Sequence, residues 1–417
     1  MKKKPVSKKK TVKKTKTAEP PKELPPNDHR ALGQALDLFS FHEIAPGAPF
    51  WHNKGMVIFR ELERYARKVN DENGYQEIST PILVKKEVFE KSGHWEHYRD
   101  NMFWFKNPVD ENEVLAIKPM NCPESTYVYN SEIRSYRDLP LRLAEIGRLH
   151  RNELSGTLGG LFRVRQITMD DAHVFVRPDQ TSEEIFNTLK IISDFYEMLG
   201  FEPRYFLATR PKKALGDKKA WDMAENALKE ALKKAKIKYE VAEGEGAFYG
   251  PKVEVHIKDS QGRDWQLGTA QLDLVMLPEK FDLAYIDENG ARQKPMVIHR
   301  AIFGSFERFI GILLEHFDGA LPFWLSPTQV AVLTINEKVS DYAKKVYKEL
   351  KAKNIRVELD SRNETIAKKI RDAEVQRVPY LLVIGEKEIK ENKVAVRERD
   401  KGDLGAKTLE EFLKMIK

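Results

Sequence analysis

The stretch from residue 143 to residue 176 constrains the fold of this chain more than any other part of its sequence. Apolar residues on both sides of a Gly-rich segment predict two antiparallel strands joined by a loop. Arg151 and Glu153 stand two residues apart before the loop, so strand alternation puts both side chains on one face. After the loop, Arg163 and Arg165 share a face for the same reason. This concentration of charge suits a ligand with anionic groups and an amino donor, and a nucleoside triphosphate supplies both.

The same hairpin has a purely structural alternative, a solvated pair of strands with cross-strand Arg–Glu ion pairs. Its order of residues, Arg-x-Glu, a loop and a further Arg, resembles motif 2 of the class II aminoacyl-tRNA synthetases. The continuation Asp170-Asp171-Ala172-His173 is similar to the threonyl-tRNA synthetase form of that motif. The resemblance covers roughly residues 28 to 417.

The composition is that of a soluble globular protein large enough for two or three domains, with 417 residues, 41% of them hydrophobic and 32% charged. No apolar run reaches the roughly 18 residues of a membrane span, and no apolar segment follows the N-terminal lysines as in a signal peptide. Cys122 is the single cysteine, which excludes an internal disulfide. We therefore expect a cytoplasmic protein with no membrane partner.

The net charge of +7 is concentrated in the N-terminal tail. Residues 1–27 hold ten lysines against Glu19 and Glu23, which gives +8 and leaves about −1 for the rest of the chain. The tail has too little apolar surface to fold, so we expect it to be disordered. It acts either as a solubilising arm or as a non-specific RNA-binding arm.

The chain divides into three predicted segments. Residues 1–27 form the Lys-rich tail, residues 28–323 the catalytic domain, and residues 324–417 a smaller domain. The expected fold class is α/β: an α+β catalytic domain with an antiparallel sheet of class II synthetase type, and a small α/β anticodon-binding domain with a mixed sheet.

Two further segments resemble family motifs. A helical pattern over 56–70, a strand over 75–78 and Pro81 resemble motif 1, which builds the dimer interface in class II synthetases. An ordinary helix packed on a sheet is the alternative. A strand over 297–301 that leads into a helix bearing Arg308 resembles motif 3. The resemblance implies a homodimer.

Strands and helices alternate in the last domain, which predicts a mixed sheet. The expected strands and helices span, in order, residues 330–335, 339–351, 355–359, 364–373, 380–384, 393–397 and 409–416. By resemblance, Asn363, Glu388 and Arg397 read anticodon bases of tRNA, since each carries donor or acceptor groups suited to a base edge. A solvated trio of surface residues is the alternative.

The metal ligands come from the resemblance alone. Cys122, His173 and His299 are 51 and 126 residues apart, which is no local zinc-binding spacing. Taken singly, a lone Cys is more often a buried small hydrophobe. The three match the family's zinc ligands, which implies one Zn²⁺ per chain with a coordination position left for threonine. Threonine would offer its hydroxyl to the metal, whereas valine has no hydroxyl to offer. By the same resemblance, Asp171 is placed to accept a hydrogen bond from the threonine hydroxyl.

The resemblance also assigns roles in adenylation. Arg151 holds the α-phosphate and stabilises the charge of the transition state, Glu153 reads the adenine amino group, and Arg163 contacts the terminal phosphate. Arg308 clamps the nucleotide, and Mg²⁺ bridges the phosphates of ATP. His94 assists transfer to the ribose hydroxyl.

The remaining candidates position the substrates. Besides Asp171, they are Tyr249, Gln271, Ser305 and Met120. The chain departs from the usual family pattern at Ile167, at Met169 and at Glu124-Ser125, which concerns the packing around adenine and substrate rather than the reaction.

The resemblance implies a threonyl-tRNA synthetase that uses ATP and L-threonine to charge tRNA(Thr). One alternative is a catalytically dead synthetase paralogue that serves as an RNA-binding or polymerase accessory subunit. Another is a class II synthetase for a different amino acid. Because only the tail precedes the catalytic body, we expect this form to lack the N-terminal editing domains. We then expect either that a separate, trans-editing protein clears mischarged serine or that the sequence is a shortened form.

Overall fold

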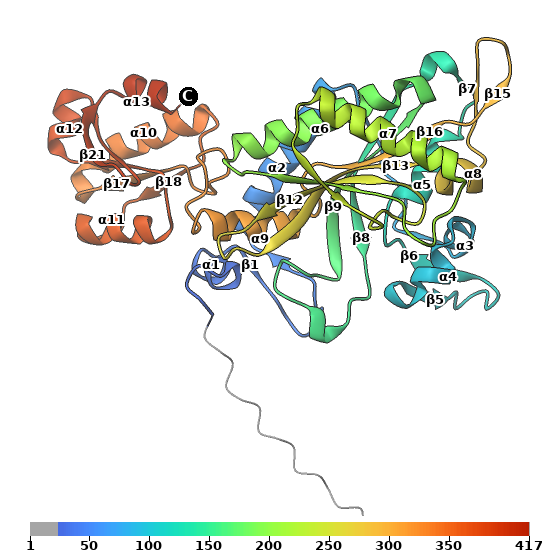
Figure 1. Ribbon diagram of the computed structural model, residues 1–417. Coiled ribbons are helices and arrows are strands. Elements are labelled where there is room, and N and C mark those ends of the chain that lie inside the picture. The colour runs from blue at the N-terminus through green and yellow to red at the C-terminus, as the bar shows by residue number, and fades with distance from the viewer. Residues whose placement is uncertain (1–23, 417) are drawn as a thin grey trace, which may run out of the picture.

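The computed structural model describes residues 24–416, and Figure 1 traces the remaining residues in grey. Most of the predicted tail, residues 1–23, therefore lies outside the described residues. Residues 24–27 form a loop and turn that lead into helix α1, His29–Ala35, whose N-cap is Asp28. Within the described part of the chain, no helix combines the length and the apolar character required to cross a bilayer.

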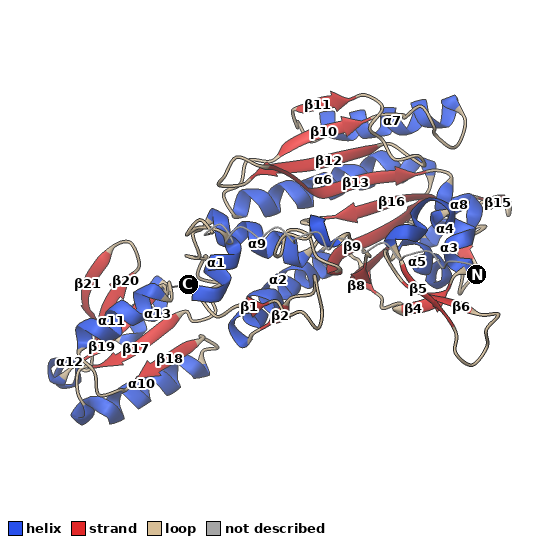
Figure 2. Cartoon of the chain, turned by 90° about the horizontal axis from the view of Figure 1, so that it is seen from below, coloured by secondary structure: helices blue, strands red, loops and turns tan. Residues whose placement is uncertain are grey.

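An eight-stranded sheet forms the centre of the larger domain (Figures 1 and 2). Neighbouring strands are antiparallel except at the two ends, where β11 runs parallel to β10 and β3 runs parallel to β8. In spatial order the strands are β11 Tyr239–Ala242, β10 Arg204–Ala208, β12 Lys252–Lys258, β13 Asp264–Asp273, β16 Met296–Ala301, β9 Gln166–Val176, β8 Leu141–His150 and β3 Gln76–Glu77. The predicted antiparallel sheet is confirmed.

Strand alternation gives this sheet two different faces. Ala144, Ala172 and Ile298 point into the main apolar core, together with residues of four helices. These helices are α2 Asn53–Glu72, α6 Thr181–Met198, α7 Lys218–Lys234 and α9 Phe306–His316. The neighbouring residues along the same strands, among them His173 and His299, lie on the opposite face. Polar side chains can therefore gather there without interrupting the core.

Smaller elements cover this second face. A three-stranded sheet comprises β4 Leu83–Lys85, β6 Val114–Ile117 and β5 Phe103–Lys106, and it lies near helices α3 Glu87–Ser92, α4 His94–Tyr98 and α5 Cys122–Tyr129. The domain's remaining short elements are β7 Arg134–Ser135, α8 Met276–Lys280, β14 Tyr285–Ile286, β15 Arg292–Gln293, and the pair β1 Phe39–Ser40 and β2 Phe50–Trp51. The last two strands pack instead with the main core, through Phe39 and Trp51. The helix predicted over 56–70 is confirmed in α2, which is longer at both ends.

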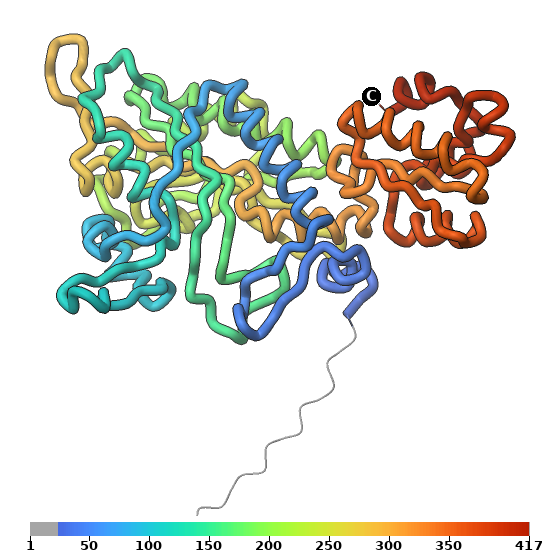
Figure 3. The backbone as a smooth tube through the Cα atoms, turned by 180° about the vertical axis from the view of Figure 1, so that it is seen from behind, coloured from blue at the N-terminus to red at the C-terminus, as the bar shows by residue number. Residues whose placement is uncertain are grey.

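The last domain projects from one end of the molecule (Figure 3) and has the predicted mixed sheet. Strands β18, β17 and β19 are parallel, and β20 and β21 continue the sheet antiparallel. The elements are β17 Val330–Thr334, α10 Ser340–Ala352, β18 Val357–Asp360, α11 Ile366–Val375, β19 Tyr380–Ile384, α12 Glu386–Glu391, β20 Val394–Glu398, β21 Gly402–Lys407 and α13 Leu409–Met415. The sequence prediction omitted α12 and β21.

A buried ion pair ties the core helices to the sheet. The Arg300 guanidinium, fully buried, donates to Asp170 Oδ1 at 3.2 Å and to Asn70 Oδ1 at 2.8 Å. The second carboxylate oxygen of Asp170 accepts from the backbone N–H groups of Ile302 and Phe303. One cluster therefore joins α2, β9, β16 and the turn that enters α9.

Replacement of Arg300 by Met should lower the free energy of unfolding by about 3–5 kcal/mol, because it leaves Asp170 buried without its counter-ion. The matched control is Arg67→Met, which removes an exposed pair with Glu77 and should cost at most about 1 kcal/mol. Chemical denaturation followed by circular dichroism measures both. Equal losses in the two variants would contradict this description of the core.

Candidate functional site

The three predicted metal ligands converge on the covered face of the central sheet. Cys122 begins α5, His173 lies on β9 and His299 on β16. Because β9 and β16 pair with these two histidines directly opposite each other, their rings lie 4.9 Å apart between centroids. One ligand atom from each of the three residues lies within 4.8 Å of the others.

The two histidines of this group are buried, Cys122 is half-buried, and the group is incompletely hydrogen-bonded. His173 is 2% exposed, and its Nε2 has no hydrogen-bond partner among the described residues. Burial lowers the pKa of His173 well below its usual value and raises the pKa of the Cys122 thiol. His299 Nε2 lies 3.3 Å from Asp273 Oδ2, a carboxylate that orients the ring. Two imidazoles and a sulfur, one with an orphaned buried nitrogen, form a donor set that fits Zn²⁺.

Three predicted substrate residues lie beside this group. Burial raises the pKa of Asp171 to about 6, and its Oδ2 accepts from Asn121 Nδ2 at 3.1 Å. Gln271 pairs with His299 across β13 and β16, and its Oε1 accepts from the Tyr249 hydroxyl at 3.3 Å. The Gln271 amide nitrogen is buried without a partner, as far as the described residues show. Hydrogen-bonding groups are thus free next to the metal-ligand group.

His94 is close enough to this region to be affected by it electrostatically. Burial, and then the charge of His299, lower the pKa of His94 to about 4, while its Nδ1 lies 2.8 Å from Ser92 Oγ. Met120 is half-buried in the turn before α5, two residues from Cys122.

A cavity of about 300 Å³ lies along the same sheet. Arg151, Glu153, Arg163 and Arg308 line it, so four predicted nucleotide-binding residues meet there. Arg163 Nε and Glu153 Oε2 are 3.6 Å apart and form an ion pair. Burial lowers the pKa of Arg308, and the charges of the two other arginines lower it further. The cavity is thus strongly cationic, with one carboxylate at its wall.

Two residues keep the arginines in place. Arg151 Nε donates to the Pro119 carbonyl at 3.2 Å. Ser305 lines the cavity and caps α9, since its hydroxyl accepts from the Arg308 backbone N–H. Ile167 and Met169, where the sequence departs from the family pattern, also line the cavity.

The predicted common face for Arg163 and Arg165 is wrong. Strand β8 ends at His150 and β9 begins at Gln166, so strand alternation does not govern the residues between them. Arg163 lines the cavity. Arg165 does not, because its Nε donates to the Glu153 carbonyl at 2.9 Å and holds the loop together.

The three predicted anticodon residues occupy different elements. Asn363 is exposed in the loop before α11, Glu388 lies on α12 and Arg397 is half-buried on β20. Among the described residues, these side chains make no hydrogen bond to one another. The Glu388 carboxylate accepts from the Gly385 N–H at 2.9 Å and so caps α12.

The sequence analysis missed the buried polar residues that support the site. Asp273 is fully buried and also accepts from the N–H groups of the turn into α8. Because Asp273 stands two residues after Gln271 on the same strand, alternation could have placed it on the face of the site. Lys118 and Glu145 form a buried pair at 2.9 Å on the same face. Burial raises the pKa of Glu124 to about 8, and its two oxygens have no partner in the described chain.

Two protein-family models match the chain. The tRNA synthetase class II core domain (G, H, P, S and T) matches residues 103–317, and an anticodon-binding domain matches residues 329–417. The first match covers the strands that carry the metal-ligand group and the cationic cavity. The predicted fold class is confirmed.

Individual relatives of this chain indicate which class II synthetase it resembles. The chain is 52% identical to a threonine–tRNA ligase of Carboxydothermus hydrogenoformans over 95% of its length and 53% identical to that of Clostridium tetani over 93%. It spans 62% and 60% of these two relatives, about three fifths of their length. A crystal structure of the RNA-binding domain of threonyl-tRNA synthetase from Cryptosporidium parvum Iowa II is 42% identical, with a TM-score of 0.89 and coverage of 94% of this chain and 97% of that one. The predicted resemblance is therefore confirmed, and the chain belongs to the threonyl-tRNA synthetases within the class II aminoacyl-tRNA synthetase family.

Proposed function

We propose that this chain activates L-threonine with ATP to threonyl-adenylate and pyrophosphate, and then transfers threonine to the 3′ end of tRNA(Thr). The observation that carries the proposal is the convergence of Cys122, His173 and His299 beside the cationic cavity. Relatives named threonine–tRNA ligase support the choice of amino acid. A dead paralogue is less well supported, since the arginines that line the cavity and the three metal ligands are all present.

In this proposal one zinc ion is held per chain by Cys122, His173 and His299. When bound, zinc supplies a Lewis acid for the amino and hydroxyl groups of threonine. Asp171 accepts a hydrogen bond from the hydroxyl, since its carboxylate lies on the face of His173. Gln271, oriented by Tyr249, offers its unpaired amide nitrogen to the substrate carboxylate.

The cavity holds the nucleotide. Arg151 binds the α-phosphate and stabilises the negative charge that develops as threonine attacks it. Arg163 and Arg308 hold the outer phosphates and the base, and Glu153 accepts from the adenine amino group. Ser305 fixes the start of α9 and thereby the position of Arg308. Mg²⁺ accompanies ATP and neutralises its phosphates.

His94 and Met120 complete the catalytic assignment. The lowered pKa of His94 keeps its imidazole uncharged at neutral pH, so a ring nitrogen can accept the proton of the ribose hydroxyl during transfer. Met120, which stands two residues before Cys122 in the turn into α5, helps to position the substrate.

The partners follow from the same proposal. Asn363, Glu388 and Arg397 read the anticodon of tRNA(Thr), and α2 with the edge strand β3 forms a homodimer interface. A ligand thiol at Cys122 must stay reduced, which suits the cytoplasm.

Cys122→Ala should lose zinc and threonine-dependent pyrophosphate exchange while the fold persists, because the metal lies outside the main core. Metal analysis, exchange assays and thermal unfolding of the same preparations provide the measurements. Thr126→Ala, a buried change on the same helix that removes no ligand, should keep one zinc per chain. Full exchange activity in zinc-free protein would refute the metal's role.

Serine should be activated far better than valine. Serine lacks only a methyl group, which lowers kcat/KM about 10- to 200-fold, whereas loss of the hydroxyl leaves polar groups of the site unpaired and costs about 10⁴- to 10⁵-fold. Pyrophosphate exchange with each amino acid tests this order. Comparable use of valine and serine would mean that a simple apolar pocket selects the substrate.

Arg397→Ala should slow tRNA charging about tenfold, because it removes one contact to an unstacked base, and should leave threonine activation unchanged. Glu388→Ala should do the same and also lower thermal stability, since Glu388 caps α12. Glu386→Ala, an exposed change on the same helix, is the control. If charging and activation fell together, these residues would be structural.

A further inference from the structure

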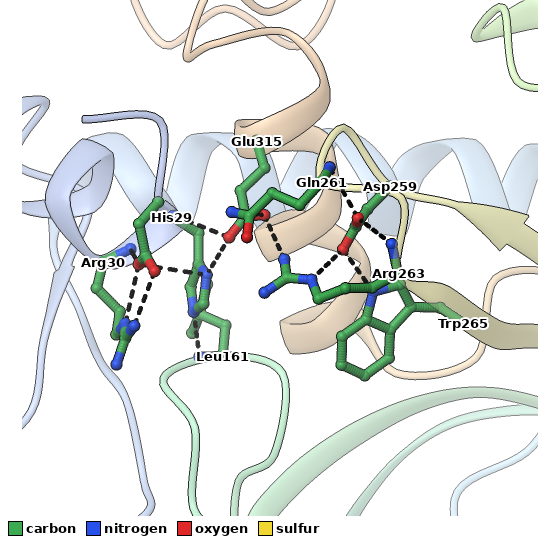
Figure 4. A network of polar contacts seen from close by, with 9 residues as sticks. His29, Arg30, Leu161, Asp259, Gln261, Arg263, Trp265 and Glu315 are labelled. Atoms are coloured by element: carbon green, nitrogen blue, oxygen red, sulfur yellow. Dashed lines mark hydrogen bonds and ion pairs between the residues drawn. The ribbon is translucent and has the colours of Figure 1, made fainter. Parts of the chain in front are cut away.

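A second group of polar residues, several of them buried, forms the network in Figure 4. His29, at the start of α1, is 2% exposed and lies between two distant segments. Its Nδ1 is 2.8 Å from Glu315 Oε1, near the end of α9. Its Nε2 accepts from the backbone N–H of Leu161, in the loop between β8 and β9, at 3.0 Å.

These contacts define the state of the imidazole. A backbone N–H can only donate, so Nε2 of His29 carries no proton and Nδ1 donates to Glu315. Asp28, Glu315 and His29 lie close enough together to hold a metal ion. Both ring nitrogens are already committed, however, and Asp28 is paired with Arg30. The group therefore acts as a hydrogen-bonded bridge.

Glu315 is itself rigidly held. Its Oε2 accepts from Arg263 Nη2 and from Gln261 Nε2, both in the turn between β12 and β13. Arg263 Nε donates to Asp259, whose carboxylate also accepts from the Trp265 indole at 2.7 Å. His29 is therefore anchored to the main sheet through two buried carboxylates.

The anchored groups surround Phe162, a residue that lines the cavity. Its ring lies 4.1 Å from the His29 ring and 4.8 Å from the Trp265 ring, between centroids. The Arg263 guanidinium lies over it at 4.8 Å. The carbonyl of Phe162 accepts from Arg308 Nε at 3.0 Å. The position of this loop residue thus determines where a cavity arginine points.

Two glycines allow this close packing. Gly160 has φ +54°, and a Cβ there would overlap His29 Nε2. A Cβ on Gly311 would lie 2.9 Å from the Phe162 ring. The loop can approach His29 and α9 this closely only because both positions lack a side chain.

We propose that His29 is a positioning residue for the nucleotide site: through Leu161 it fixes the loop that presents Phe162 and Arg163, and thereby sets the geometry of Arg308. The inference rests on the proposed function, because it takes the cationic cavity as the ATP site. It predicts that His29 affects nucleotide binding without touching the nucleotide.

The test is the dissociation constant of Mg·ATP, measured by titration calorimetry on the full chain. His29→Asn keeps an amide near Glu315 but cannot reach Leu161, so affinity should fall about tenfold. Zinc content should not change. His316→Asn is the matched control. His316 follows Glu315 on α9, but its ring packs on Phe201 and not on the loop between β8 and β9. It should leave ATP affinity within about twofold of wild type.

Gly160→Ala tests the same contact from the loop side and decides the matter if His29→Asn does not fold. This variant should lower the affinity for Mg·ATP about as much as His29→Asn does, and it should keep its zinc. Unchanged ATP affinity in the folded variants, or equal losses of ATP affinity and zinc, would overturn the inference. A wild-type chain that does not bind Mg·ATP would instead refute the proposed function.

Discussion

The register between β9 and β16 is the constraint on which the rest of the site depends. It sets His173 directly opposite His299, and the register between β16 and β13 then sets Gln271 opposite His299. A slip of one residue would turn either histidine into the apolar core, because side chains alternate between faces. The buried pair of Arg300 and Asp170, on the same two strands, would be broken by such a slip. The core therefore stabilises the register that assembles the metal-ligand group.

The two ends of the site are supported in different ways. The metal-ligand group sits on regular strands, whose geometry is fixed by ladder hydrogen bonds and by the packing beneath them. Arg151 and Arg163 lie beyond the ends of these strands, where their backbone contacts are isolated. The Arg151 N–H donates to the Arg165 carbonyl, and Arg163 forms a single bridge with Gly159. Buried side chains supply the missing support, through Asp259, Glu315 and His29. Precise positioning of a loop requires such a shell of fixed partners.

Local patterns in the sequence were sufficient for the longer regular elements near the site. The 3.6-residue periodicity of α2 and the apolar strands of the hairpin predicted both elements within a few residues. The grouping of Cys122 with His173 and His299 could come only from resemblance, since strand pairing that joins distant segments leaves no local spacing. Arg165 was misplaced because the strands end before it. Glu388 was read as a base-contacting residue, and its capping bond depends on a helix that the sequence analysis omitted.

Anomalous diffraction at the zinc absorption edge tests the central claim most directly. Crystals should be grown from protein purified without chelators, and data should be measured on both sides of the edge. The account predicts one strong zinc-specific peak per chain, about 2.3 Å from Cys122 Sγ and about 2.0–2.1 Å from one ring nitrogen each of His173 and His299. Protein that carries stoichiometric zinc but shows its peak elsewhere would contradict the account.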